Sequence, residues 1–284
     1  MFWTRLASGI VLVVIAILSL GIGGSVLALL LLAISLIAYR ELLAAFRAKP
    51  EKESRSGGSG KSFLRIHGLE AVGFAGIFAY YAAVFFSGSE ILRWVCVVGV
   101  FLASMFVYVF TFPKYHAGQV AASFFSFLYA PVMLSFVYLT RAETQGAHIV
   151  WLILISSWGS DTCAYAVGML IGKKRIFPRL SPKKSLEGCI GGVAGAALIG
   201  GLYGFFWVER LFPDQTVAGL IAFICGASAV MSQVGDLAAS GIKRNHNIKD
   251  YGSLIPGHGG IMDRFDSMIV TAPVIYFLTA LLIR

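Results

Sequence analysis

Long stretches of apolar residues, separated by short polar segments, run through the whole chain. A helix of about 20 mostly apolar residues is long enough to cross the hydrocarbon core of a bilayer. The stretches are continuous and do not alternate in polarity, which favours helices over the strands of a transmembrane barrel. The pattern predicts an all-α polytopic membrane protein with about nine transmembrane helices, at Leu6–Ile22, Ser25–Ala45, Gly68–Phe86, Ile91–Phe112, Ala117–Leu139, Ile149–Ile171, Gly188–Val208, Thr216–Ile242 and Asp263–Ile283.

The composition agrees with this pattern. Only 13% of the 284 residues are charged, against about 25% in a typical soluble domain, and the mean hydropathy is +0.81. No polar segment is large enough to fold alone, so we expect residues 1–284 to form a single membrane domain. Residues 48–67, rich in Lys, Glu, Ser and Gly, are expected to be a cytoplasmic linker, and residues 149–284 carry the candidate chemistry.

The positive charges predict the orientation of the chain. If the N-terminus is cytoplasmic, the outer side receives only Arg93, Arg141, Arg210 and Arg284, and the other 19 of the 23 Lys and Arg lie inside. Cytoplasmic loops are enriched in Lys and Arg, so the N-terminus is predicted inside and the C-terminus outside. The net charge of +9 then reflects topology and anionic headgroups, and no nucleic-acid partner is expected.

Small residues predict close helix contacts. All four cysteines lie in apolar stretches without a C-x-x-C pair and are expected to be packing residues. Pro131 is expected to kink the fifth stretch.

Glycines repeat at a spacing of four in the seventh stretch, which allows close helix packing within the chain or at the interface of a homodimer. The pairs are Gly188 and Gly192, Gly191 and Gly195, and Gly200 and Gly204.

Four aspartates lie inside or at the cytoplasmic ends of apolar stretches: Asp161, Asp236, Asp263 and Asp266. A charge at the bilayer centre costs about 2.5–3.5 kcal/mol, so such a residue usually faces a polar cavity or a partner. One interpretation is a set of structural ion pairs with Lys and Arg. Four aspartates on the same half of the membrane favour the other interpretation, a shared site.

The spacing of polar residues supports a shared site. From Thr216 to Arg244 the eighth helix would span about 43 Å at 1.5 Å per residue, against about 30 Å of hydrocarbon, so its last turns must emerge or line a cavity. Asp263 and Asp266, three residues apart, share one face of the ninth helix. The eighth helix has one polar stripe, formed by Ser232, Asp236, Ser240, Lys243 and Arg244.

The segment between the eighth and ninth stretches is suited to phosphate. Gly257, Gly259 and Gly260 surround His258 and let backbone N–H groups approach an anion closely. The ninth helix begins directly afterwards, and its N-terminus is a favourable place for phosphate. Carboxylates beside phosphate imply a bridging divalent cation, for which Mg²⁺ is suited. His258 is a proton carrier, a hydrogen-bond donor or a structural histidine.

A second basic segment follows the sixth stretch. It contains Lys173, Lys174, Arg175 and Arg179, and then Ser181-Pro182-Lys183-Lys184-Ser185-Leu186-Glu187-Gly188. By itself this segment is explained by the positive-inside rule.

Together these residues resemble the phosphatidate cytidylyltransferases, also called CDP-diacylglycerol synthases. Upstream, Asp161-Thr162-x-Ala164-Tyr165 and the Ser181–Gly188 segment resemble family motifs. No fixed position of the main motif departs from the family pattern. That motif reads Ser240-x-Ile242-Lys243-Arg244-x4-Lys249-Asp250-x-Gly252-x2-Ile255-Pro256-Gly257-His258-Gly259-Gly260-Ile261-x-Asp263-Arg264-Phe265-Asp266.

The resemblance implies that the chain converts CTP and phosphatidate into CDP-diacylglycerol and pyrophosphate with Mg²⁺, in a bacterial inner membrane. It implies that Asp236 and Asp263 bind the metal and that Asp266 and Lys243 assist catalysis. It leaves open whether a second cation takes part. Residues implied in substrate binding are Asp161, Lys183, Lys184, Ser185, Glu187, Ser240, Arg244, Lys249, Asp250, Gly257, His258, Gly259, Gly260 and Arg264.

Two other functions are considered. A secondary transporter would use polar residues in the membrane, but such residues would lie near the midplane between inverted repeats, and neither feature is found here. Another lipid-phosphate transferase, using a CDP-alcohol or a polyprenyl phosphate, would need similar charges.

Overall fold

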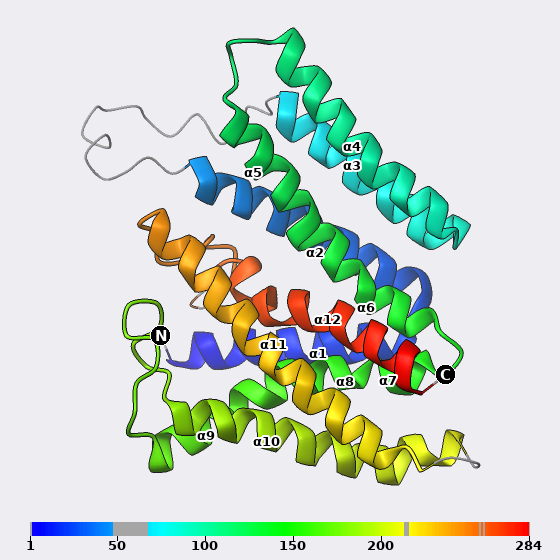
Figure 1. Cartoon of the computed structure of the whole chain (residues 1–284), viewed down its shortest axis with the longest axis vertical. Helices are drawn as coiled ribbons and strands as arrows, with labels where there is room; N and C mark the ends of the chain where they lie inside the picture. Colours follow the sequence, from blue (N-terminus) through cyan, green and yellow to red (C-terminus); the bar gives the residue numbers. More distant parts are fainter. Residues whose placement is uncertain (1, 48–67, 213–215, 256, 258, 284) are drawn as a thin grey trace. The chain divides into compact units, whose positions relative to one another are not determined.

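The computed structural model describes residues 2–47, 68–212, 216–255, 257 and 259–283. Within these ranges the chain is helical, and its only β-type pairing is two isolated bridges, Arg175–Ser185 and Ile255–Gly259. Figure 1 shows long helices joined by short loops. The all-α prediction is confirmed for the described part of the chain. The predicted linker at 48–67 lies outside the described residues.

Each predicted stretch corresponds to helical structure. Seven helical segments of the described chain are long and apolar enough to cross a membrane. The first stretch contains only a shorter apolar helix, Ser8–Ile22, and the sixth is divided into short pieces. In chain order the elements are α1 Phe2–Ile22, α2 Gly24–Arg47, α3 Gly68–Ala82, η2 Ala83–Ser87, α4 Glu90–Phe110, α5 Ala117–Phe127, η3 Leu128–Val132, α6 Met133–Ala142, α7 Gly146–Ile149, α8 Trp151–Leu154, η4 Ile155–Gly159, α9 Ser160–Ile171, α10 Leu186–Tyr203, η5 Gly204–Val208, η6 Glu209–Leu211, α11 Ala218–Asn245 and α12 Met262–Leu282.

Turns of π-helix interrupt several of these helices. Pro131 lies in one of them, η3, between α5 and α6. Proline has no N–H to donate and clashes with the preceding turn, and a wider turn is one way to relieve that conflict. The disturbance predicted at Pro131 therefore takes the form of a π-turn.

The described chain divides into two compact units, and the single membrane domain stays a prediction. Unit 1 comprises Met1–Ile10, Ala28–Ser135 and Ile242–Asp263, and unit 2 comprises Val11–Leu27, Phe136–Gly241 and Arg264–Arg284. The helices α11 and α12 each contribute residues to both units.

In unit 1, buried hydroxyl groups join the apolar helices. The hydroxyl of Tyr39 on α2 lies 2.9 Å from that of Ser123 on α5, and Ser35 of α2 lies 2.7 Å from the hydroxyl of Tyr81 on α3. Because lipid offers no hydrogen-bond partners, such contacts between helices satisfy groups that would otherwise be unpaired.

In unit 2, glycines of α10 allow close approach to α9 and α11. A Cβ atom at Gly195 would lie 2.5 Å from the sulfur of Cys163 on α9. A Cβ atom at Gly192 would lie 2.9 Å from both the Ser160 carbonyl oxygen and the Cβ of Ala164. The glycine repeat thus packs helices within the chain, as one of its two interpretations predicts.

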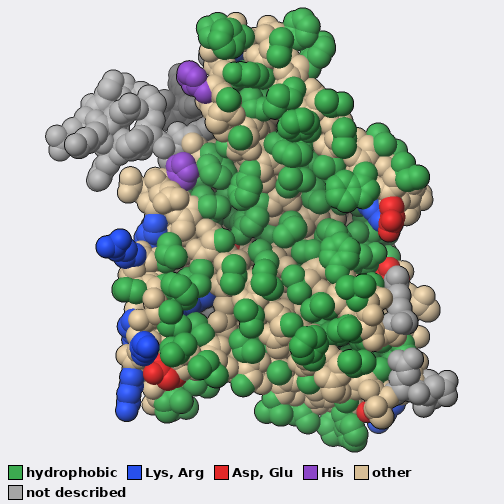
Figure 2. Space-filling view, viewed as in Figure 1, with side chains coloured by type: hydrophobic (Ala, Val, Ile, Leu, Met, Phe, Trp, Pro, Cys, Tyr) green, Lys and Arg blue, Asp and Glu red, His purple; other side chains and the backbone are tan. Residues whose placement is uncertain are grey.

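The surface of the helices is strongly apolar. Figure 2 shows hydrophobic side chains over most of the visible face. On α4 the exposed fractions are 68% for Trp94, 64% for Phe106 and 66% for Val109. Such apolar surface on helices of membrane-spanning length is what a lipid environment requires. The chain is therefore an integral membrane protein.

Candidate functional site

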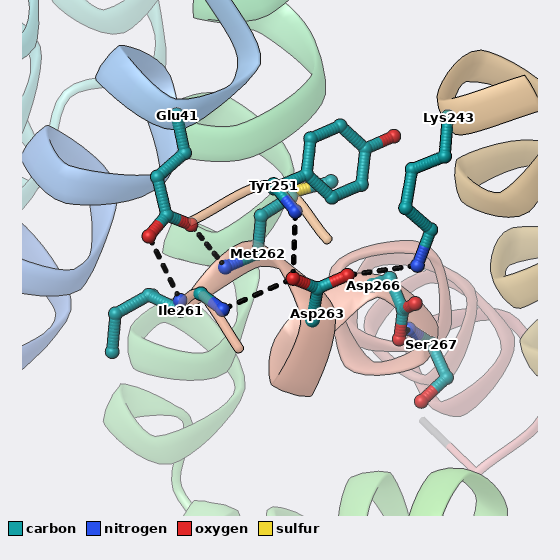
Figure 3. Close-up of polar contacts among 9 residues, drawn as sticks. Glu41, Lys243, Tyr251, Ile261, Met262, Asp263, Asp266 and Ser267 are labelled. Atoms are coloured by element: carbon teal, nitrogen blue, oxygen red, sulfur yellow. Dashed lines mark hydrogen bonds and ion pairs between the residues drawn. The ribbon is translucent and has the colours of Figure 1, made fainter. Parts of the chain in front are cut away.

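Asp263, in the first turn of α12, is the centre of the polar contacts in unit 1 (Figure 3). Its Oδ2 accepts hydrogen bonds from the backbone N–H groups of Tyr251, at 2.8 Å, and Gly260, at 3.0 Å. Its Oδ1 accepts a hydrogen bond from the ammonium of Lys243, at 2.8 Å. One carboxylate therefore joins both ends of the 251–260 loop to the end of α11.

The Lys243–Asp263 pair is largely withdrawn from solvent. The side chains are 15% and 4% exposed, respectively. The Lys243 ammonium also lies 5.4 Å from the centre of the Tyr251 ring, within the range of a cation–π contact. A buried carboxylate without a positive partner is strongly unfavourable, so the Lys243 ammonium at 2.8 Å offsets the charge that Asp263 carries into this site.

Glu41, on α2, is a functional candidate that the sequence reasoning missed. Its carboxylate accepts hydrogen bonds from the N–H groups of Ile261, at 3.1 Å, and Met262, at 2.8 Å, as Figure 3 shows. The available signal was an acidic residue inside an apolar stretch, but Glu41 follows Arg40 near the end of that stretch, where charged residues are common.

The contacts of Glu41 correct one expectation about phosphate binding. The first N–H groups of a helix have no partner within the helix and commonly bind anions. At the start of α12, however, Glu41 accepts from Ile261 and Met262, while Asp263 accepts from Gly260. These N–H groups already bind protein carboxylates, so they do not form an open phosphate site in this structure.

In the loop before α12, two glycines have a left-handed backbone conformation, which glycine favours. Gly257 and Gly259 have φ values of 78° and 88°, in the left-handed region that other residues rarely adopt. Ile255 donates its N–H to the Gly259 carbonyl at 2.9 Å, which closes the turn. His258 and Pro256 lie outside the described residues. Arg244, Lys249 and Asp250 are exposed.

In unit 2, Asp236 of α11 forms an ion pair with Lys184, with Nζ and Oδ2 2.5 Å apart. The two side chains are 30% and 20% exposed, respectively. Asp161 of α9 lies within electrostatic range of both residues and within interaction range of the Ser267 side chain. The structure thus brings together three of the predicted site residues, Asp161, Lys184 and Asp236.

The basic segment before α10 is a folded loop. Glu187 accepts the N–H groups of Lys173, at 3.0 Å, and Lys174, at 3.2 Å. The hydroxyl of Ser185 caps α10 by accepting the N–H of Gly188 at 3.2 Å. Both side chains therefore have a role in shaping this loop, and their contact with a substrate stays a prediction. Lys183 is exposed, which leaves its ammonium accessible.

Three further predicted residues lie on α11 and α12. Asp266 of α12 is 7% exposed and accepts the N–H of Ser267 at 2.8 Å. Ser240 of α11 is half-buried, and Arg264 of α12 is exposed.

The described carboxylates do not converge on one closed metal site. Within the described residues, no group of three His, Cys, Asp or Glu side chains converges as a metal site. The Nζ of Lys184 lies 2.5 Å from Oδ2 of Asp236. Carboxylate oxygens are the ligands that hard divalent cations prefer, so the donor chemistry fits, while the lysines supply the positive charge in the arrangement observed.

Comparison with known proteins decides the family. The sequence profile of the Cytidylyltransferase family matches residues 3–282. The chain belongs to the cytidylyltransferase family. It is 30% identical to a phosphatidate cytidylyltransferase of Staphylococcus epidermidis over 261 residues, which cover 90% of each chain. The family resemblance that the motifs indicate is confirmed.

Other relatives match over shorter segments. A phosphatidate cytidylyltransferase of Thermotoga maritima is 37% identical over 168 residues, 57% of this chain and 60% of that protein. One from Bacillus subtilis is 36% identical over 146 residues, 51% of this chain and 52% of that protein. The chain thus spans little more than half the length of these relatives.

Proposed function

We propose that the chain is a phosphatidate cytidylyltransferase of phospholipid biosynthesis. An oxygen of the phosphatidate phosphate forms a bond to the α-phosphorus of CTP, the bond between that phosphorus and the bridging oxygen breaks, and pyrophosphate leaves. The products are CDP-diacylglycerol and pyrophosphate. The observation that supports this proposal most directly is the family match over residues 3–282, together with relatives named for this activity.

The side chains suit a reaction that depends on alignment and charge neutralisation. A phosphate monoester is largely ionised near neutral pH, so the lipid phosphate needs no strong general base. Positive groups that offset the charge of the triphosphate contribute most of the catalysis in such transfers. We assign this role to Lys243, Arg244, Lys249 and Arg264, and to Lys183 and Lys184 of the folded loop.

Nine further residues contact the substrates or shape the loops that do. They are Asp161, Ser185, Glu187, Ser240, Asp250, Gly257, His258, Gly259 and Gly260. Asp266 assists catalysis.

The proposed cofactor is Mg²⁺, held by carboxylate oxygens of Asp236 and Asp263. When bound, the cation would neutralise phosphate charge and orient the phosphoryl group. Support comes from the donor chemistry of these carboxylates. In the structure each is paired with a lysine, at 2.5 Å for Asp236 and 2.8 Å for Asp263, and the cation would join or replace that lysine.

For the topology we propose nine membrane spans with a cytoplasmic N-terminus and an external C-terminus, in a bacterial inner membrane. The distribution of Lys and Arg supports this orientation. The active site then faces the cytoplasm, where CTP is available, and phosphatidate enters sideways from the bilayer. A homodimer is the proposed assembly, and part of the apolar surface that otherwise faces lipid would form its contact.

The test uses the purified chain in detergent with phosphatidate, Mg²⁺ and one of four nucleotides, CTP, UTP, ATP or GTP. We expect pyrophosphate and CDP-lipid with CTP only, and loss of both products on chelation of the cation. Replacing phosphatidate by a polyprenyl phosphate or a CDP-alcohol should give no product. Folded wild-type protein that releases no pyrophosphate would contradict the proposal, and substrate flux into sealed liposomes without CTP turnover would favour a transporter.

A further inference from the structure

We propose that Glu41 of α2 is a positioning residue for nucleotidyl transfer, because it fixes the start of α12 and thereby the direction of the Asp263 carboxylate. The catalytic part of this inference rests on the proposed function, whereas the structural part does not. Glu41 lies in the first half of the chain, far in sequence from the motifs that mark the family.

The contact itself is specific. The two oxygens of Glu41 accept two consecutive backbone N–H groups, those of Ile261 and Met262 (Figure 3). These residues directly precede Asp263, whose own carboxylate binds Lys243 and the N–H groups of Tyr251 and Gly260. Since a helix turn is stiff, the position of these two N–H groups determines where the Asp263 side chain begins.

The surrounding glycines show that the carboxylate occupies a closely fitted place. A Cβ atom at Gly260 would lie 2.5 Å from Oε2 of Glu41, and one at Gly252 would overlap Oε1. Gly252 is not among the glycines with positive φ, so its backbone conformation would tolerate alanine. The three atoms nearest to that Cβ atom all belong to Glu41.

The chemistry of the two contacts requires a carboxylate. A carboxylate has two acceptor oxygens, whereas the glutamine amide has one acceptor and one donor group. Glu41→Gln would therefore set an N–H₂ group against one of the two backbone N–H groups. The start of α12 would shift or loosen, with little change in the apolar packing around α2.

Such a shift should affect the rate more than binding. A displacement of about 1 Å in a catalytic group can lower the rate by about 10²-fold. We expect Glu41→Gln to lower kcat by about 10- to 100-fold, with the KM for CTP changed by less than about 3-fold. A purely structural role would instead lower kcat only in proportion to the folded fraction.

The experiment compares purified full-length variants in detergent. Glu41→Gln is matched with Ser35→Ala, which removes another buried side-chain hydrogen bond from the same helix. Thermal unfolding gives the folded fraction, and pyrophosphate release gives kcat and KM. We expect a large loss of kcat for Glu41→Gln and a small one for Ser35→Ala. Equal losses, or losses that follow the folded fraction, would overturn the inference.

A double-mutant cycle keeps the test decisive if Glu41→Gln folds poorly. Gly252→Ala alone should lower kcat, because its methyl group displaces the Glu41 carboxylate. In a Glu41→Ala background the same Gly252→Ala substitution should have little further effect. Additive effects of the two substitutions would show that Gly252 does not act through Glu41, and would overturn the inference.

Amide hydrogen exchange separates this inference from the proposed function. Peptides covering residues 251–263 should exchange faster in Glu41→Gln than in wild type, while peptides from α3 and α5 should be unchanged. Unchanged exchange at 251–263 would overturn the positioning role even if the enzyme is active. Faster exchange in a wild-type protein that shows no nucleotidyl transfer would reject the proposed function and retain the positioning role.

Discussion

Two loops of this protein are held by a glutamate in the same way, but from different distances in sequence. Glu187 accepts the N–H groups of Lys173 and Lys174, 14 and 13 residues earlier. Glu41 accepts those of Ile261 and Met262, 220 and 221 residues later. The loop before α10 is thus organised by its own neighbours, whereas the start of α12 depends on a helix from the other end of the chain.

The ion pairs of the two units differ in a related way. Lys243 and Asp263 are 15% and 4% exposed, and Lys184 and Asp236 are 20% and 30% exposed. Removing one partner of a buried pair leaves an uncompensated charge, while a more exposed pair is compensated by solvent. The contacts around Asp263 should therefore be much more sensitive to substitution than those around Asp236 and Glu187.

The largest effect is expected for Asp263→Asn. The substitution removes the negative charge opposite Lys243 and the proposed metal ligand, so pyrophosphate release should fall by about 10³-fold. Glu90→Gln, at an exposed glutamate on α4, is the matched control and should retain full activity.

A double variant distinguishes catalysis from loop anchoring. In Lys243→Met with Asp263→Asn, both members of the ion pair are neutral, so the conflict of charges at the loop is removed. We expect the thermal stability to recover in part while the activity stays lost. Recovery of activity together with stability would show that Asp263 only anchors the loop.

The next largest effect, a loss of stability, is expected when either lysine of the two ion pairs is replaced. Lys243→Met leaves Asp263 buried without a partner and should lower the stability by about 3 kcal/mol. Lys184→Met leaves a more exposed Asp236 and should lower it by about 1 kcal/mol. Thermal unfolding of both variants in one detergent tests the difference. Equal losses would remove the contrast between the two pairs.

A smaller effect is expected where Ser185 caps α10. Ser185→Ala removes the acceptor for the Gly188 N–H, and loss of such a cap costs about 1 kcal/mol. Ser185→Asn, which keeps a capping side chain, should retain most of the stability. If the asparagine variant is as unstable as the alanine variant, Ser185 stabilises the loop by another contact.

The smallest effect is expected for Glu187→Gln. Its hydrogen bonds to the loop are exposed to solvent, so water can replace one of them. We expect pyrophosphate release to fall by less than about 3-fold, with the unfolding temperature unchanged. A loss as large as that of Glu41→Gln would show that the local loop is no less sensitive than the distant one.

The helices could be predicted because a bilayer demands long apolar segments. All nine predicted stretches contain helical structure, with boundaries shifted by a few residues. The division of the sixth stretch into α7, α8, η4 and α9 could not be predicted, because such breaks depend on how backbone groups find partners in the folded state. The motif residues were identifiable because phosphate chemistry needs charged residues, which lipid-facing helices otherwise avoid.

The sequence by itself determined the membrane class, the family and the polar residues to examine. Only the tertiary structure decided that Glu41 belongs with them, and that the N–H groups at the start of α12 bind carboxylates of the protein. Apolar periodicity and short motifs are local properties of a sequence. A hydrogen bond between residues 220 positions apart is not, because it depends on how helices pack and on the space that Gly252 and Gly260 leave beside Glu41.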